Sequence, residues 1–251
     1  MLNIVIPMAG RGSRFANEGY IDPKPLIDLN GKKMIEVVIN NLRPSIKHRF
    51  IFICQNEHIK AYGLNDRLKE WCPGSKVIGI DGVTEGAACT VLLAKQLIDT
   101  EEPLMIANSD QWVDASIDDY LAKMQSNAYD GMIMTMKAND PKWSFVEFDE
   151  FNHVSNVVEK VVVSDEATVG IYNFKRGSDF VKYAELMIER NERSNGEFYV
   201  APVYTYLYKE ENYKIGVYNI GEDANGMYGL GIPSDLNLFL TKEISKKALK
   251  F

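Results

Sequence analysis

The stretch that decides the fold runs from Ile4 to Met34. It reads IVIPMAGRGSRF over residues 4–15, DPKPL over residues 22–26 and GKKM over residues 31–34. An apolar strand leads into a glycine-rich turn with two arginines, and a lysine between two prolines follows. Glycine lets main-chain N–H groups approach an anion closely, while arginine and lysine add charge-assisted hydrogen bonds. The stretch therefore predicts a polyphosphate-binding site.

The same residues exclude two common nucleotide motifs. Phe15 stands where the dinucleotide fingerprint has its third glycine, and no Gly-Lys-Ser/Thr follows as in a P-loop. An ordinary tight turn in an α/β domain is the alternative interpretation of Gly10-x-Gly12. Arg14 and the Pro23-Lys24-Pro25 triplet favour phosphate binding, because they add positive charge beside the turn.

Composition narrows the class of protein. A length of 251 residues allows one large α/β domain, and a net charge of −7 argues against a general nucleic-acid binder. No apolar run reaches the ~20 residues that cross a bilayer, so no membrane insertion is expected. The cysteines Cys54, Cys72 and Cys89 show neither metal-ligand spacing nor the even number of a disulfide framework. We expect a cytoplasmic protein.

Hydrophobic periodicity indicates alternating strands and helices. In the first half, strands are predicted at Leu2–Pro7, Phe50–Cys54, Lys76–Ile80 and Pro103–Ala107. Helices are predicted at Met34–Leu42, from a cap at Asn56 toward Trp71, and at Ala87–Ile98. In the second half, strands are predicted at Gly131–Lys137, Ser144–Phe148, Val154–Val163, Thr168–Phe174 and Ile215–Ile220, with helices at Ser178–Asn191 and after a cap at Ser234. The segment Phe198–Lys209 fits either period.

This alternation predicts an α/β fold with a mostly parallel mixed sheet and helices on both faces. Ligands of such sheets bind outside the carboxyl ends of the strands. Gly10–Arg14, Glu85–Ala88 and Asn108–Asp110 all fall at such ends. Asp110 follows an apolar strand, where a carboxylate either makes a turn or holds Mg²⁺ against a phosphate.

With these residues in place, the chain resembles the sugar-phosphate type of nucleotidyltransferase. That family's signature is roughly G-x-G-[ST]-R-[LMF], then P-K-P-L and G-K-x-[ML], and all parts occur here in order. The resemblance implies a Rossmann-like, nucleotide-diphospho-sugar transferase-like fold over a single domain, residues 1–251. It also implies that Asp110 binds the Mg²⁺ cofactor, and that the nucleotide contacts Met8, Ala9, Gly10, Gly12, Arg14, Lys24, Gly86 and Ala87. Arg14, Lys24 and Asp110 are the expected catalytic residues.

The acceptor motifs depart further from the family. Trp143–Phe148, Val158–Lys160 and Gly170–Tyr172 resemble the family's Y-G-x-[VI]-x-F, E-K-P and G-[IV]-Y, but Ser144 replaces a glycine and Val161 a proline. The resemblance implies acceptor contacts from Ser144, Glu159, Lys160, Tyr172 and Glu197. We therefore expect residues 1–130 to bind the nucleotide and residues 131–251 the acceptor. Gly229 occupies the position of the family's second metal aspartate, for which Glu222, Asp223 or Asp235 are candidate substitutes.

The expected partners are a nucleoside triphosphate and a phosphorylated small-molecule acceptor, with release of pyrophosphate. The altered acceptor motifs and short chain resemble cytidylyltransferases of cell-surface and capsule synthesis, which favours CTP, with phosphorylated glutamine as a candidate acceptor. Two alternatives are a metal-dependent glycosyltransferase that uses a nucleotide sugar, although Ser109-Asp110-Gln111 is not a D-x-D motif, and a catalytically silent nucleotide-binding protein. The sequence is also compatible with a homo-oligomer.

Overall fold

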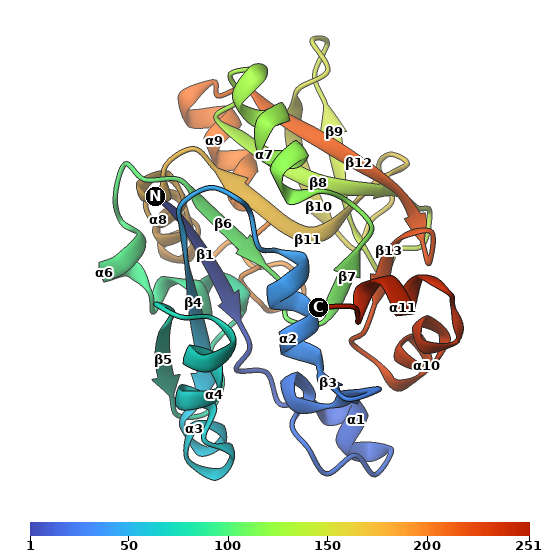
Figure 1. The fold of residues 1–251 in the computed structure, drawn as a ribbon. Coiled ribbons are helices and arrows are strands. Elements are labelled where there is room, and N and C mark those ends of the chain that lie inside the picture. Colours follow the sequence, from blue (N-terminus) through green and yellow to red (C-terminus); the bar gives the residue numbers. More distant parts are fainter.

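A computed structural model describes residues 1–251 and is built around one large mixed sheet (Figure 1). Its eleven strands come from both halves of the chain. They are β1 (Leu2–Pro7), β4 (His48–Gln55), β5 (Lys76–Ile80), β6 (Leu104–Ala107), β7 (Gln111–Val113), β8 (Gly131–Lys137), β9 (Ser144–Phe148), β10 (Val154–Glu159), β11 (Glu166–Phe174), β12 (Ile215–Asp223) and β13 (Gly226–Gly229). A separate hairpin consists of β2 (Asp28–Leu29) and β3 (Lys32–Lys33).

The order of the strands places β1 and β6 near the centre. The main path runs β5-β4-β1-β6-β11-β8-β12-β13-β7, and the pairs from β5 to β6 are all parallel. Strand β11 then runs antiparallel to both β6 and β8, while β12 is parallel to β8. Strands β9 and β10 form an antiparallel arm that joins β11. The predicted mixed α/β sheet is confirmed.

Helices cover both faces of the sheet, as predicted. They are α1 (Ser13–Asn17), α2 (Met34–Asn41), α3 (Asn56–Tyr62), α4 (Leu64–Trp71), α5 (Ala87–Leu92), α6 (Lys95–Ile98), α7 (Ile117–Ser126), α8 (Gly177–Glu189), α9 (Val203–Glu211), α10 (Pro233–Thr241) and α11 (Ile244–Ala248), with a 3-10 turn η1 at Lys24–Leu26. None of the helices combines the length and the apolar character needed to cross a membrane.

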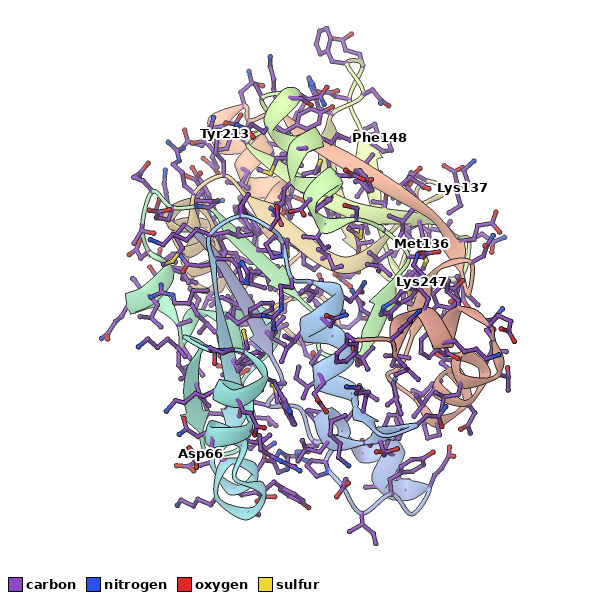
Figure 2. All side chains as sticks on the ribbon, viewed as in Figure 1. Asp66, Met136, Lys137, Phe148, Tyr213 and Lys247 are labelled. Carbon is purple, nitrogen blue, oxygen red and sulfur yellow. The ribbon has the colours of Figure 1, made fainter.

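The core follows from the alternation of side chains along each strand. Ile4 and Ile6 of β1 belong to a cluster with α2, α4 and α7, whereas Val5 belongs to one with α5, α8 and α9. At the end of β8, Met136 is fully buried while the neighbouring Lys137 is exposed (Figure 2). A third cluster packs α10 and α11 against the β2–β3 hairpin region, which fixes the C-terminal helices beside the glycine-rich loop.

Several element boundaries differ from the prediction. The helix expected from Asn56 to Trp71 is broken at Gly63, which has φ +61°, and Asn56 donates to Asp81 instead of capping. The helix expected from Ala87 to Ile98 is interrupted between Leu92 and Lys95. Gly63 is both the C-cap of α3 and the N-cap of α4, and hydrophobic periodicity alone does not predict such a break.

The second half shows similar corrections. The strand expected to continue to Val163 ends at Glu159, because Lys160 adopts φ +57° and breaks the extended backbone. The ambiguous segment after Phe198 is helical from Val203. The last helical region begins at Pro233 with Ile232 at its N-cap, so Ser234 lies inside the first turn and caps nothing. It is also split into α10 and α11.

Candidate active site

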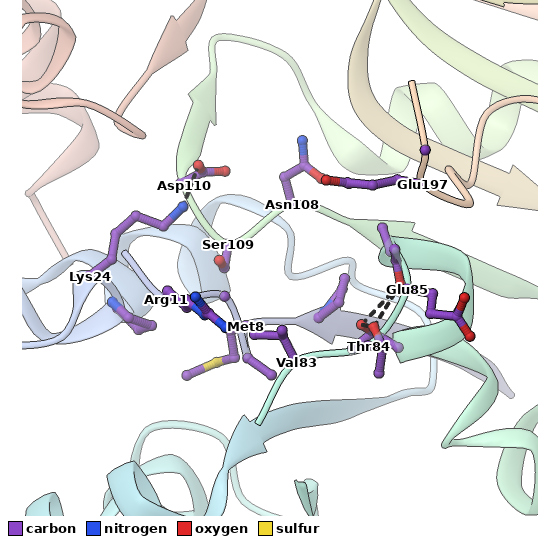
Figure 3. Close-up of a pocket in the computed structure, with 18 of the residues that line it drawn as sticks. Met8, Arg11, Lys24, Val83, Thr84, Glu85, Asn108, Ser109, Asp110 and Glu197 are labelled. Atoms are coloured by element: carbon purple, nitrogen blue, oxygen red, sulfur yellow. Dashed lines mark hydrogen bonds and ion pairs between the residues drawn. The ribbon is translucent and has the colours of Figure 1, made fainter. Parts of the chain in front are cut away.

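The carboxyl ends of β1 and β6 open into a cavity of about 560 Å³ (Figure 3). Three loops line it: the glycine-rich loop after β1, the loop after β5, and Asn108–Asp110 after β6. Residues from the second half, Arg193, Gly196 and Glu197, close another side. The strand-end segments that the sequence pointed to therefore do meet in space.

An ion pair connects two walls of this cavity. Lys24 lies in η1 between Pro23 and Pro25, and its Nζ is 2.7 Å from Oδ2 of Asp110. Both side chains are about a quarter exposed, at 24% and 25% (Figure 3). Gly12, at φ +62°, packs against this lysine, since a Cβ added there would lie 3.4 Å from the Cβ of Lys24. The glycine turn and the proline-flanked lysine are therefore one packed unit.

The structure gathers most of the expected nucleotide contacts, but not all. Those that line the large cavity are Met8, Ala9, Gly10, Lys24, Gly86, Ala87 and Asp110. Gly12 lies in an adjoining hollow of about 360 Å³, which shares Arg11 and Lys24 with the cavity. Arg14 lines neither, because α1 has already begun at Ser13 and turns its side chain to solvent. Of the two arginines in this motif, Arg11, which precedes the helix, is the one that lines the cavity.

Gly86 is held by the main chain of the second half. Its φ of +142° and ψ of 173° are accessible essentially to glycine alone, and a Cβ would lie 2.4 Å from the carbonyl oxygen of Phe198. Phe198 donates its N–H to Glu85 and accepts from the N–H of Ala88. The hydroxyl of Thr84 donates to the Gly86 carbonyl, which fixes the turn (Figure 3).

A second cavity, of about 270 Å³, adjoins the first. Four of the five expected acceptor residues line it. Ser144 comes from β9, Glu159 from the end of β10, Lys160 from the turn directly after β10, and Tyr172 from β11. Ser144 donates its hydroxyl to Glu159 at 2.7 Å, and burial raises the pKa of the Glu159 carboxyl. The fifth expected residue, Glu197, lines the larger cavity instead.

The two cavities share Pro7, Ala87 and Asn108. Asn108 is the only one of these three residues with a polar side chain, and the sequence motifs predict no ligand contact for it. Its place directly after β6 and two residues before Asp110 was the signal that could have found it. Arg193 was also missed. It pairs with Glu85 and covers the Phe198 ring at 4.1 Å, contacts between segments that no local motif connects.

For a divalent cation, the large cavity offers the carboxylate of Asp110 at the end of β6; Glu85, which pairs with Arg193, and Glu197 line the cavity as well. No group of three or more His, Cys, Asp or Glu side chains is placed to hold a metal ion. Gly231 leaves room for Asp110, since a Cβ there would lie 2.5 Å from its Oδ2. Of the candidate second carboxylates, Asp235 and Asp223 lie in a separate hollow with Gly229, and Lys142 pairs with Asp223. Glu222 lines neither cavity.

The fold and the cavities first define a class. A mixed α/β sheet with a glycine-rich loop and a lysine–aspartate pair at the strand ends is the architecture of a nucleotide-binding enzyme. The family is shown by a model described as nucleotidyl transferase, which matches residues 4–214. The chain belongs to this family.

Relatives in sequence are distant. The chain is 28% identical over 188 residues to the mannose-1-phosphate guanylyltransferase catalytic subunit beta of Dictyostelium discoideum, covering 69% of this chain and 49% of that protein. It is 24% identical over 252 residues to the bifunctional protein GlmU of Methanocaldococcus jannaschii, covering 97% of this chain and 55% of that protein. The chain thus spans about half the length of these curated relatives.

Solved structures agree on the fold. A nucleoside-diphosphate-sugar pyrophosphorylase from Vibrio cholerae RC9 superposes with a TM-score of 0.79 and 25% identity, covering 95% of this chain and all of that one. The inositol-1-phosphate CTP transferase of T. maritima gives a TM-score of 0.70 at 14% identity, over 98% of this chain and 95% of that one. This second likeness concerns the fold alone.

Proposed function

We propose that this protein transfers the nucleotidyl group of a nucleoside triphosphate to the phosphate of a small-molecule acceptor and releases pyrophosphate. The observation that carries the proposal is the meeting of two cavities at Pro7, Ala87 and Asn108. One cavity holds the Lys24–Asp110 pair, and the other holds Glu159 and Lys160. The Dictyostelium discoideum relative, which is named a mannose-1-phosphate guanylyltransferase, supports the same reaction.

In this reaction an oxygen of the acceptor phosphate attacks the α-phosphorus of the triphosphate. A new phosphorus–oxygen bond forms, the bond from the α-phosphorus to the oxygen bridging to the β-phosphorus breaks, and pyrophosphate leaves with both electrons of that bond. The attacking phosphate is already an anion, so no strong general base is required. Alignment of the reactants and neutralisation of charge are the contributions expected of the protein.

The roles follow the two cavities. The main chain of Met8, Ala9, Gly10 and Gly12 is proposed to contact the triphosphate, with Lys24 and Arg11 from the cavity wall; Arg14, which α1 turns to solvent, is not assigned this role. Gly86 and Ala87 are proposed to carry the base, and Ser144, Glu159, Lys160 and Tyr172 the acceptor. Glu197 would contact the acceptor where it meets the nucleotide, since it lies in the larger cavity.

Magnesium fits this site as an ion that comes with the nucleotide. Mg²⁺ commonly takes one or two protein carboxylates and completes its shell with phosphate oxygens and water. Asp110 is placed to be that carboxylate, once Lys24 turns from it to a phosphate. When bound, the ion would neutralise charge on the phosphates. The family resemblance adds weight, because its members use an aspartate at this position.

CTP is the nucleotide we propose, for precursors of cell-surface or capsular polysaccharide. Support comes from the acceptor motifs. Ser144 and Val161 depart there from the hexose-type motifs, and in this the chain resembles the capsule cytidylyltransferases. The T. maritima enzyme, whose name specifies CTP, shares the fold. A silent nucleotide-binding protein is the second candidate, because Gly229 stands where a second metal aspartate is expected.

Pyrophosphate release tests these proposals. The four common nucleoside triphosphates would each be combined with Mg²⁺ and with mannose 1-phosphate, glucose 1-phosphate, inositol 1-phosphate or phosphorylated glutamine. Release that requires both one triphosphate and one acceptor supports the transferase, and release with CTP supports the nucleotide assignment. Tight binding of a triphosphate without release in any combination supports the silent binder and contradicts the transferase.

A further inference from the structure

Gln111, at the start of β7, carries a buried amide whose nitrogen has no partner. The residue is 7% exposed, and its Nε2 makes no hydrogen bond in the structure. Two other buried polar atoms share this condition, on Thr135 and Asn173, but neither residue lines the acceptor cavity, whereas Gln111 does. A buried donor without an acceptor is unfavourable, so its presence beside a cavity indicates a ligand.

The orientation of this amide is fixed from its other side. Asn108 donates from Nδ2 to Oε1 of Gln111 over a long 3.5 Å, which leaves the Gln111 NH₂ group free. Gly170, at φ +79°, makes room for the pair, because a Cβ there would lie 2.1 Å from Nδ2 of Asn108 and 3.1 Å from Oε1 of Gln111. The N–H of Asn108 also donates to the Gly170 carbonyl at 3.0 Å.

The other polar groups of this cavity indicate which oxygen would accept. Glu159 presents a carboxylate, an acceptor of hydrogen bonds, in the same cavity as the Gln111 donor. A hydroxyl group can donate to one and accept from the other. Lys142 and Lys160 line the cavity as well; Lys142 pairs with Asp223, which leaves Lys160 as the cation that can meet the phosphate of the acceptor.

We propose that Gln111 is a specificity-determining residue, whose Nε2 donates to a hydroxyl oxygen of a sugar or polyol phosphate in the acceptor cavity. Asn108 is its positioning residue. The proposal rests on the proposed function, in that the smaller cavity is taken as the acceptor site. It adds the residue and the atom that would recognise a hydroxyl group of the acceptor.

Binding to the full chain tests this directly by calorimetry, without turnover. Gln111→Glu keeps the oxygen that accepts from Asn108 and replaces the donating nitrogen, and Gln111→Leu removes both polar atoms. We expect mannose 1-phosphate or inositol 1-phosphate to bind about tenfold more weakly to both variants, as for a lost hydrogen bond to a ligand. Inorganic phosphate, which has no carbon-borne hydroxyl, should bind the wild type and the uncharged Gln111→Leu variant equally, and so should the triphosphate.

Thr135→Val is the matched control, because it also removes an unpartnered buried polar atom but lies outside the cavity. It should leave sugar-phosphate binding unchanged. Unchanged binding of both sugar phosphates in the two Gln111 variants would overturn the role of Nε2. Tighter binding of O-phosphoserine than of every hydroxylated phosphate would overturn the acceptor class.

Failure of the proposed function looks different from failure of this inference. If no triphosphate releases pyrophosphate, yet wild-type protein binds a sugar phosphate and Gln111→Leu weakens that binding while inorganic phosphate binds both forms equally, the transferase is contradicted and Gln111 is upheld. If pyrophosphate is released and the Gln111 variants keep wild-type affinity and KM for the acceptor, the transferase is upheld and the inference is contradicted.

Discussion

The two cavities are built in different ways. Loops after the parallel strands β1, β5 and β6 form most of the larger one, with main chain from glycine-rich segments and two ion pairs, Lys24–Asp110 and Arg193–Glu85. Side chains on the antiparallel strands β9, β10 and β11 form much of the smaller one. A site formed by the main chain requires a few glycines and a charge held in place, and these residues form a recognisable motif. In a site formed by side chains each residue contributes its own contact, so a motif does not identify the acceptor.

The first and largest test of this comparison is Lys24→Ala. The lysine is the one cation paired with Asp110 in the large cavity, and loss of a preorganised charge costs about 10²–10³ in kcat. We expect a loss of that order at saturating nucleotide and acceptor, with an unchanged melting temperature. Lys32→Ala, in the nearby hairpin, is the control and should keep full turnover. Full turnover in Lys24→Ala would remove the lysine from the mechanism.

Gly86→Ala tests the demand for glycine in a backbone-made wall. The added Cβ would meet the main chain of Phe198 at 2.4 Å, so unfolding in urea should show about 3 kcal/mol less stability, from the clash and the strained φ together. Gly82→Ala is the matched control, since Gly82 also has positive φ (+75°) but open space around it. It should lose only about 1 kcal/mol. Equal losses would show that backbone conformation alone, and not contact with Phe198, requires the glycine.

Sequence reasoning was most successful where a local pattern carries the structure. Strand β1, the turn after it and the lysine between prolines are short-range features, and Gly10, Lys24 and Asp110 do line one cavity. It failed where contacts between segments distant in sequence determine the structure. Strands β7 and β13 are short and pair with each other, and neither is predicted from the hydrophobic pattern.

The site shows the same division. Main-chain hydrogen bonds connect Phe198 to the Gly86 loop. Such bonds do not depend on which side chains are present, so the sequence does not predict them. Arg14 stood in the expected motif, yet the start of α1 at Ser13 turns it out of the cavity and leaves Arg11 there. The motifs correctly predicted which loops form the cavity. Which side chains of those loops face the cavity depends on how the loops pack, and the motifs do not predict that.

Glu159→Gln tests the side-chain-made cavity through pH. Burial raises the pKa of Glu159 above its ordinary 4.5, so the folded protein holds this proton more tightly than the unfolded chain does. The wild type therefore loses stability as pH rises from below 4.5 through the raised pKa. The glutamine variant lacks that loss. Its free energy of unfolding should exceed that of the wild type near neutral pH, with no such gain below 4.5.

The same variant should raise the KM for the acceptor about tenfold, because a hydrogen bond to a charged group is lost. Glu57→Gln is the control, since that side chain is 79% exposed and water solvates it in both states. A gain in stability for Glu159→Gln that is equal at both pH values would show that burial of the charge is not its cause.

The smallest effect is expected for Asp235→Asn, which tests whether one carboxylate or two bind the metal ion. Asp235 lies 3.2 Å from where a Cβ on Gly229 would be, so it is the carboxylate nearest to the missing family aspartate. It lies, however, in a hollow separate from the cavity of Asp110. Asp235→Asn should therefore change kcat/KM by no more than roughly a factor of two, as for a surface substitution. Asp110→Asn should abolish most turnover. If Asp235→Asn raises the Mg²⁺ concentration needed for half-maximal rate as strongly as Asp110→Asn does, the cavity has a second carboxylate, and binding of substrate must bring the two hollows together.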